Sequence, residues 1–231
     1  MIVFSGVTDC YQPAEREFRL TRRCLEVALE ARQPIGIISK NALVTRDLDI
    51  LSEMSAMNLV HVFISITTLD RQLALEMEPR TSGPDARLRA ISDLRSARVP
   101  VGVIVAPVIP SLNDGEIPSI LCAAKNAGAT TANYVLLRLP LTVEVVFREW
   151  LARACPSKAS RIMDRIRATR DGKVNDSTWG ERMCGTGEIA AHIRRSFQVF
   201  SKKHSLDGQL PELDCSQFLT PKTRTGQQFL F

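Results

Sequence analysis

The chain has 231 residues, of which 45% are hydrophobic and 24% are charged. This length can bury one sizeable core, so one main domain with a small extension is expected. The sequence contains no run of about 18 apolar residues that would form a membrane span, and its first residues lack the pattern of a secretory signal. We therefore expect a cytoplasmic protein.

The basic residues gather in the C-terminal part. Residues 1–150 carry 16 basic and 17 acidic side chains, whereas residues 151–231 carry 14 and 8, so the net charge of +5 comes from the second region. An excess of basic residues of this size can attract nucleic-acid phosphates, but it is also found on ordinary solvated surfaces. We favour the second interpretation.

Apolar runs and helical periodicity alternate along the first 140 residues. The predicted strands are residues 2–4, 35–38, 60–66, 101–106 and 134–139. The predicted helices are residues 14–32, a helix capped by Thr45, and residues 69–77, 85–98 and 117–127. This alternation predicts an α/β fold with a parallel sheet, built as a partial β/α barrel.

The regular alternation stops after Pro140. Residues 143–203 read as three helices, and the remaining tail has little periodicity. We divide the chain into a partial barrel (1–140), a helical extension (141–205) and a flexible tail (206–231). The first strand starts at residue 2, which would leave an exposed edge on a parallel sheet, so one β/α unit is expected to be missing before it.

Polar residues end the predicted strands, where parallel β/α folds carry their chemistry. Lys40 follows an apolar strand and suits a carboxylate or a phosphate, although a surface lysine would look the same. Ser65 lies within a strand and is a better ligand candidate than the neighbouring hydroxyls. The full set of candidate mouth residues is Ser5, Thr8, Asp9, Ser39, Lys40, Ser65, Thr67, Asn113 and Arg138.

Charged residues after the third strand have two interpretations. Glu78, Arg80 and Arg87 surround one loop, and they can hold that loop through ion pairs as readily as they hold a substrate. We treat this set as structural, with a binding role kept open, and Arg80 is its candidate substrate or loop residue. Asp9 has a similar alternative, because an aspartate in a turn often bonds its own backbone.

Local motifs exclude several common classes of site. The six cysteines form no CxxC or CxxxC pair, so their spacing gives no metal ligand set, and no disulfide framework is expected. The scattered histidines suggest neither a metal cluster nor a Ser-His-Asp set. No Gly-rich dinucleotide motif or P-loop is present. A phosphate-binding barrel enzyme would need a Gly-rich loop after a late strand, and Gly128 is on the wrong side.

Five segments carry a family resemblance: Ser5 to Glu15, Ile38 to Lys40, Ser65 to Asp70, Glu78 to Arg80 and Val105 to Asp114. Taken together, they resemble the radical S-adenosylmethionine (radical SAM) proteins of the spore photoproduct lyase-like branch. The resemblance implies a six-stranded partial barrel that holds a [4Fe-4S] cluster and S-adenosylmethionine, and that generates a 5′-deoxyadenosyl radical. It also implies that Lys40 and Ser65 contact the methionine moiety and that Ser5 lines the same groove.

The remaining strand-end residues are candidates for substrate binding or for loop structure in this resemblance: Thr8, Asp9, Thr67, Arg80, Asn113 and Arg138. The chain lacks the CxxxCxxC motif that holds the cluster in this family, and its first strand corresponds to the family's second. The chain is then a fragment, the product of a mis-assigned start, or a degenerate homologue, and we predict that it does not assemble the cluster alone.

The sequence leads to two hypotheses for the function and one hypothesis for a binding partner. The first function is radical chemistry by the full-length form, with nucleic acid as the favoured substrate, and the second is a non-catalytic binding module that has lost its redox centre. The last five residues, with Gln227, Leu230 and Phe231, resemble the QxxLF peptide that binds the bacterial sliding clamp. We expect that tail to bind the clamp.

Overall fold

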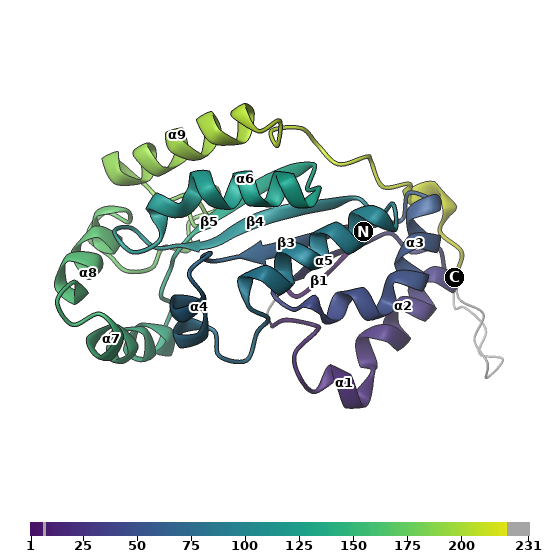
Figure 1. The fold of residues 1–231 in the computed structure, drawn as a ribbon, viewed down its shortest axis with the longest axis horizontal. Coiled ribbons are helices and arrows are strands. Elements are labelled where there is room, and N and C mark those ends of the chain that lie inside the picture. Colours follow the sequence, from purple (N-terminus) through teal and green to yellow (C-terminus); the bar gives the residue numbers. More distant parts are fainter. Residues whose placement is uncertain (7, 221–231) are drawn as a thin grey trace.

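The sheet contains five parallel strands in chain order (Figure 1). The structure is a computed structural model that describes residues 1–6 and 8–220. The strands are β1 (Ile2–Phe4), β2 (Ile35–Ser39), β3 (Val60–Ile66), β4 (Val101–Val108) and β5 (Thr131–Leu136). The prediction of an α/β fold with five parallel strands is confirmed.

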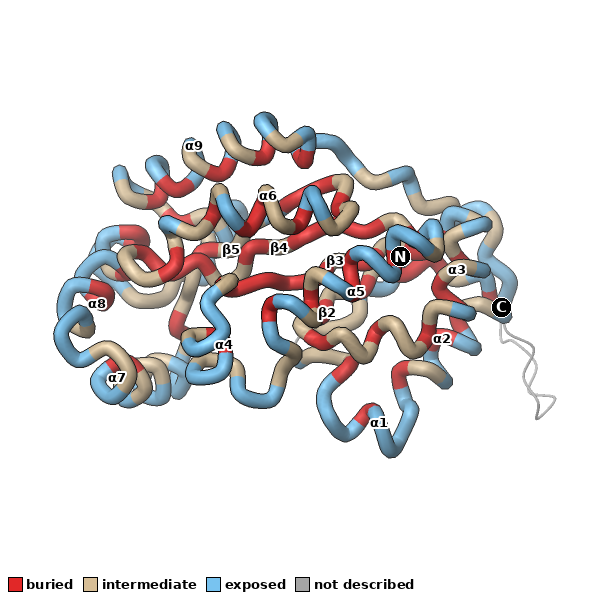
Figure 2. Tube along the Cα trace, in the orientation of Figure 1, coloured by how far each residue is buried: buried red, intermediate tan, exposed pale blue. Residues whose placement is uncertain are grey.

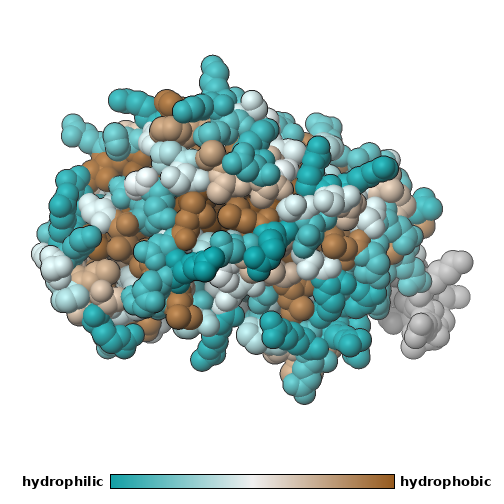
Figure 3. Space-filling view, in the orientation of Figure 1, coloured by the Kyte–Doolittle hydropathy of each residue, from teal (hydrophilic) through white to brown (hydrophobic). Residues whose placement is uncertain are grey.

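Helices connect each strand to the next, and α7, α8, α9 and η3 follow the last strand. The first group is α1 (Glu15–Phe18), α2 (Leu20–Glu30), the 3₁₀ helix η1 (Ala42–Asp47), α3 (Leu48–Ala56), α4 (Arg71–Met77) and α5 (Pro84–Ser96). The second group is η2 (Asp114–Glu116), α6 (Ile117–Ala127), α7 (Thr142–Ala154), α8 (Ala159–Ala168), α9 (Gly187–Lys203) and η3 (Cys215–Gln217). Figure 3 shows hydrophilic side chains over much of the outward surface, with apolar patches near the centre of that view.

The two faces of the sheet are buried to different extents. One face carries fully buried side chains, which include Ile35, Ile37, Val62 and Ile64. Figure 2 shows that the strands are largely buried beneath the helices. The residues that alternate with them are only half-buried, among them Ile38, His61, Phe63 and Ile104. Because strand side chains alternate between faces, one face is covered by helices and the other is partly open.

The helices after β5 pack in two different places. Leu151 of α7 and Ile162, Met163 and Ile166 of α8 form a small apolar cluster with Ile109 and Leu139, which follow β4 and β5. Helix α9 instead packs on α6 and β5 and contributes Ala190, Ile193 and Phe197 to the main core. The α7–α8 pair therefore lies at the carboxyl ends of the strands.

Residues 206–219 run past the amino ends of the strands. Leu206 is buried, and its carbonyl accepts a hydrogen bond from Ala132 N at 2.8 Å. Further along, Asp214 N donates to Asn58 O at 2.9 Å and Leu219 N donates to Ala31 O at 2.8 Å. This part of the predicted tail is thus bonded to residues next to β5, β3 and β2.

Several predicted element ends differ from the structure. The helix predicted over 14–32 is divided into α1 and α2 because Arg19 adopts a left-handed conformation, with φ of 51°. Thr45 is not an N-cap, since Asn41 caps η1 by accepting a hydrogen bond from Leu43 N at 3.0 Å. Strand β5 starts at Thr131 and ends at Leu136, three residues earlier than predicted at each end.

Candidate active site

The sheet register places Lys40 and Ser65 on the same face. Ser39 pairs with Ile64, so the next residues of the two strands, Lys40 and Ser65, are neighbours on the partly open face. Both come from carboxyl ends of parallel strands, where loops converge. The two residues that the sequence predicts to contact one ligand therefore lie side by side.

The ammonium group of Lys40 forms an ion pair with Glu78. Lys40 Nζ bonds Glu78 Oε1 and also lies 3.4 Å from Thr67 Oγ1. The side chain of Lys40 is 27% exposed and that of Glu78 is 11% exposed. The pair can thus be reached from solvent through Lys40, while most of the Glu78 carboxylate is shielded.

Arg87 holds the other side of the Glu78 carboxylate. Its guanidinium donates to Glu78 Oε2 at 2.6 Å, to Thr81 Oγ1 at 2.6 Å and to Ser65 O at 2.9 Å, although Arg87 itself is only 2% exposed. Burial alone would raise the pKa of Glu78, but the charges of Lys40 and Arg87 outweigh it and lower that pKa below its ordinary value. Glu78 is therefore an ionised group with a fixed orientation.

Two buried hydroxyls connect this ion pair to β4. Ser65 Oγ donates to Ala106 O at 3.1 Å, and Thr67 Oγ1 lies 2.8 Å from the same carbonyl and 2.9 Å from Glu78 Oε1. Ser65 and Thr67 are 2% and 1% exposed. The structure thus brings Lys40, Ser65, Thr67 and Glu78 into one network, in which Lys40 is the most accessible group.

Asp9 fixes the end of β2. Its carboxylate accepts hydrogen bonds from Lys40 N at 2.7 Å, from Ser39 Oγ at 2.9 Å and from Tyr11 N at 2.9 Å. Nearby, Ser5 Oγ accepts a hydrogen bond from Cys10 N at 3.0 Å. Asp9 and Ser5 therefore shape the loop after β1, and Asp9 sets the backbone position from which Lys40 extends.

The other predicted site residues lie apart from the ion pair or are already bonded. Asn113 is 2% exposed and donates through its amide to Thr67 O at 2.7 Å and Pro107 O at 3.0 Å. Thr8 and Arg80 are exposed. Arg138 is half-buried after β5. Burial lowers the pKa of the nearby Arg170 guanidinium, and the positive charge of Arg138 lowers it further.

Glu78 contacts Lys40, which the sequence did not predict. We interpreted Glu78 and Arg87 as structural with a binding role kept open, and their ion pair is present, but the same carboxylate also contacts Lys40, 38 residues away along the chain. Local spacing carries no signal for such a contact. Glu78 also borders a cavity of about 470 Å³ between α4 and α5 that Lys40 does not reach.

The residues present fit S-adenosylmethionine but not an iron–sulfur cluster. An ammonium group, a carboxylate and hydroxyls at strand ends match the charged amino-acid end of S-adenosylmethionine. Within residues 1–6 and 8–220, no three His, Cys, Asp or Glu side chains gather as metal ligands. Cys10 is one of the six free cysteines, and burial raises the pKa of its thiol to about 11, which disfavours the thiolate that a cluster needs.

The fold agrees with the comparison to known families. Residues 1–122 match the Radical SAM superfamily, and the chain belongs to it. It is 35% identical over 162 residues to uncharacterized proteins of Mycobacterium tuberculosis and Mycobacterium bovis, covering 69% of this chain and 48% of theirs. The chain thus spans about half the length of these relatives. An uncharacterized protein of Methanocaldococcus jannaschii is 30% identical over 115 residues.

Solved structures of spore photoproduct lyase share the fold at low identity. The lyase complexed with dinucleoside spore photoproduct superposes with a TM-score of 0.62 and 15% identity, covering 88% of this chain and 58% of the lyase. A mutant of the lyase with bound AdoMet and the dinucleoside gives the same TM-score and identity. The fold therefore resembles the partial barrel of radical SAM proteins. No helix in the described part of the chain is long and apolar enough to cross a membrane.

Proposed function

We propose that this chain provides the S-adenosylmethionine site of a radical SAM protein similar to spore photoproduct lyase. The observation that carries the proposal is the Lys40–Glu78 ion pair beside Thr67, at strand ends of a superfamily member. Lys40 would bind the methionine carboxylate, and Ser5 and Ser65 would line the same groove. Bound S-adenosylmethionine supplies the 5′-deoxyadenosyl group for hydrogen abstraction in this superfamily, and radical chemistry on the substrate belongs to the whole protein.

Calorimetric titration with S-adenosylmethionine tests this proposal. We expect the wild-type chain to bind and Lys40→Met to weaken binding by about tenfold, because a charge-assisted contact to the ligand carboxylate is lost. Lys125→Met on the exposed side of α6 is the matched control and should bind as the wild type does. Lack of binding by a folded wild-type chain would favour the alternative, a non-catalytic binding module.

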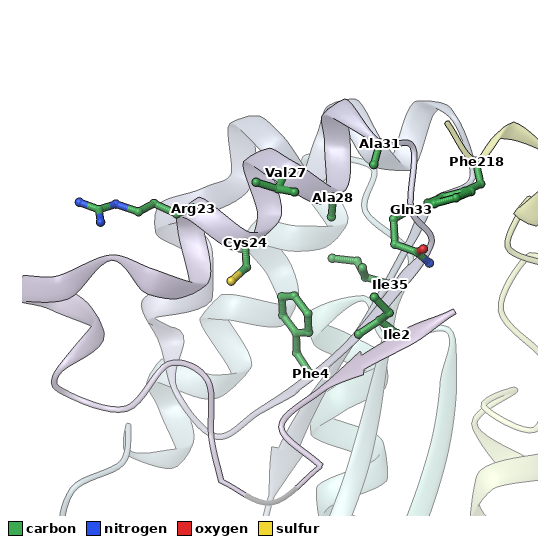
Figure 4. Close-up of a pocket in the computed structure, with 10 residues that line it drawn as sticks. All are labelled: Ile2, Phe4, Arg23, Cys24, Val27, Ala28, Ala31, Gln33, Ile35 and Phe218. Atoms are coloured by element: carbon green, nitrogen blue, oxygen red, sulfur yellow. The ribbon is translucent and has the colours of Figure 1, made fainter. Parts of the chain in front are cut away.

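Among the described residues no strand pairs with the outer edge of β1, and this supports an additional strand–helix unit there. Beside β1 lies an apolar cavity of about 500 Å³ between β1 and α2 (Figure 4). Its walls include Phe4, Val27, Ala28 and Ile35, and Val27 is 57% exposed. We propose that a strand pairs with β1, that its helix fills this cavity, and that this unit carries the cluster-binding cysteines.

Co-expression with the genomic segment that precedes the Met1 codon tests the strand–helix unit. The complex should contain iron after anaerobic reconstitution and bind less of a hydrophobic dye than the chain alone, because Phe4 and Val27 become covered. Val27→Glu should prevent complex formation, whereas Val199→Glu, which changes an equally exposed valine on α9, should not. A stoichiometric [4Fe-4S] signal from this chain by itself would refute the prediction that it does not assemble the cluster.

Nucleic acid is the substrate class that we propose. Lys158, which precedes α8, and Arg161 and Arg165 of α8 are exposed at helical spacing and form no ion pair with any other described residue. Trp179 is 83% exposed, with the Arg182 guanidinium 4.6 Å from its ring centre. Unpaired cations suit phosphates, and an exposed indole suits base stacking.

Tryptophan fluorescence tests nucleic-acid binding, because Trp150 and Trp179 are the two tryptophans of the chain. A single-stranded oligonucleotide should quench the wild type and Trp150→Phe, whereas Trp179→Phe should lose the quenching. Replacing Arg161 and Arg165 by alanine should weaken binding and reduce its salt dependence. Unchanged fluorescence at saturating oligonucleotide and low salt would contradict the proposal.

The predicted clamp-binding residues Gln227, Leu230 and Phe231 lie outside the described residues. Clamp binding is therefore proposed from the sequence alone. A peptide of the last eleven residues should bind purified bacterial sliding clamp, and Phe231→Ala should abolish that binding.

A further inference from the structure

We propose that a groove at the amino ends of β3 and β5 binds a guanine base, which stacks on Phe63 and is bound by Asp207 and Asn133. The groove lies at the opposite end of the strands from Lys40, so this inference goes beyond the proposed function. Its cavity of about 360 Å³ is within the range of small-molecule sites, about 300–1,000 Å³. The residues that line it include His61, Phe63, Thr131, Asn133, Asp207 and Gly208.

Phe63 supplies an aromatic surface to this groove. Its register partner on β4 is Gly102, and the partner of Gly102 on β5 is Thr131. A Cβ atom on Gly102 would lie 2.5 Å from Phe63 Cε1 and 2.7 Å from Thr131 Cγ2, so the Phe63 ring occupies the space that a side chain at position 102 would fill. The ring therefore leans across β4 toward β5, and because Phe63 is half-buried, part of the ring surface faces the cavity.

The rim of the groove is held against β5. Ala132 N donates a hydrogen bond to Leu206 O at 2.8 Å, and Thr131 Oγ1 donates to Gly208 O at 2.5 Å. Asp207 lies between these two anchored residues. Its side chain thus extends from backbone that is already fixed, which reduces the ordering cost when a ligand binds.

Asn133 and Asp207 have side chains available for a ligand. Both residues are exposed, and within residues 1–6 and 8–220 neither side chain has a hydrogen-bond or ion-pair partner. On the wall formed by β3, burial lowers the pKa of His61, although a hydrogen bond to the Pro211 backbone raises it in part. His61 is therefore neutral at pH 7 and adds no positive charge that would compete for Asp207.

An aromatic ring, a carboxylate and an amide in one groove favour guanine among planar ligands. Aromatic side chains stack on any base, so the selection comes from the polar groups. An ionised carboxylate only accepts hydrogen bonds, and guanine presents two adjacent N–H donors, on N1 and on its 2-amino group. The Asn133 amide can donate to guanine O6 or N7. Adenine has an acceptor beside its single amino group, which a carboxylate would repel.

Titration of the chain with guanosine and adenosine, followed by NMR, tests the site. We expect guanosine to shift the signals of His61 and Asp207, and Asp207→Asn to weaken guanosine by about tenfold while leaving adenosine within about twofold. Asn133→Ala should also weaken guanosine, and Phe63→Leu should weaken both nucleosides because the stacking surface is lost. Asp93→Asn, which changes an exposed carboxylate on α5, is the matched control and should bind as the wild type does.

Two oligonucleotides distinguish a free nucleoside from a base within a strand. If the strand is the source, an oligothymidine with one guanine should bind more tightly than oligothymidine, and Asp207→Asn should remove the difference. If the free nucleoside is the source, the guanine should add nothing while guanosine still binds. Trp179→Phe should leave guanosine affinity unchanged, so this result is independent of the proposed nucleic-acid surface. Absence of guanosine binding by the folded wild type would overturn the inference, and so would binding that neither Asp207→Asn nor Asn133→Ala changes.

Discussion

Lys40 and Ser65 illustrate what residue types at strand ends can predict. Both stand at the carboxyl end of an apolar run, and the parallel register makes them neighbours, as the sequence pattern indicated. Their accessibility could not be predicted, because it depends on Ala106 of β4 and on Glu78, which follows α4. Ser65 is buried and bonds a carbonyl, so its contact with a ligand remains a prediction.

The ionisation of Glu78 makes stability depend on pH. Its pKa is lowered in the folded protein, so Glu78 contributes stability that is complete above its unfolded pKa of about 4.3 and is lost as the pH falls through the folded value. Glu78→Gln should lower the free energy of unfolding by about 3 kcal/mol at pH 7, because it leaves the Arg87 charge buried without its partner.

Urea unfolding at several pH values measures this effect. The difference in the free energy of unfolding between wild type and Glu78→Gln should be constant near neutral pH. It should become smaller below about pH 4, where the wild-type carboxyl group also becomes neutral. Glu76→Gln should follow the wild type at each pH, because Glu76 is exposed. A difference that does not change with pH would contradict the ionised state of Glu78.

Cysteine reactivity provides a second test at the scale of single residues. Burial raises the pKa of Cys10 to about 11, whereas Cys24 and Cys215 are exposed. Iodoacetamide reacts with the thiolate, so at pH 8 it should label Cys24 and Cys215 at least about ten times faster than Cys10. Peptide mass spectrometry gives the rates, and in urea all three should become similar. Fast labelling of Cys10 in the folded protein would show that its thiol is not shielded.

At the scale of elements, periodicity predicted the helices and strands better than their ends. The helix predicted over 14–32 breaks at Arg19 because the Glu15 carboxylate accepts hydrogen bonds from Thr21 N at 3.0 Å and Arg22 N at 3.3 Å and so starts α2 anew. The predicted start of β5 is three residues too late, because Thr131 and Asn133 give no apolar signal. In the structure these two residues pair with Gly102 and Ile104 of β4. Both effects depend on partners that hydropathy does not identify.

A buried carboxylate joins α2 to η1 and α3. Asp47 is fully buried and accepts from Tyr11 Oη at 3.1 Å, Arg22 Nη1 at 3.1 Å and Arg46 Nε at 2.8 Å. Asp49 binds the same Arg22 at 2.7 Å but is 61% exposed. The same arginine therefore contacts one buried and one exposed carboxylate, which makes a matched pair for mutation.

Asp47→Asn should lower the free energy of unfolding by about 3 kcal/mol, because Arg22 and Arg46 lose a buried counter-charge. Asp49→Asn should lower it by less than about 1 kcal/mol, since exposed ion pairs are weak. Urea denaturation at pH 7 compares both with the wild type. Equal effects of the two substitutions would mean that burial does not determine the strength of this ion pair.

At the scale of the whole molecule, the chain after α9 returns along the amino ends of the strands. The sequence predicted a flexible tail from residue 206 because residues 206–220 lack periodicity, yet non-periodic segments can be held by scattered contacts. Thr131 Oγ1 donates to Gly208 O at 2.5 Å, and Gln217 Nε2 donates to Met57 O at 3.0 Å. Those contacts connect residues more than 70 positions apart, which no local pattern reveals.

Leu206 anchors this returning segment in the main core, where it is fully buried. Leu206→Ala should therefore lower the free energy of unfolding by about 2–4 kcal/mol through lost burial and the cavity left behind. Leu219→Ala, at the other end of the segment, removes the same atoms from a side chain that is 50% exposed and should cost less than about 1 kcal/mol. Urea unfolding gives both values. Similar, small effects of the two substitutions would mean that residues 206–219 lie on the surface without contributing to the core.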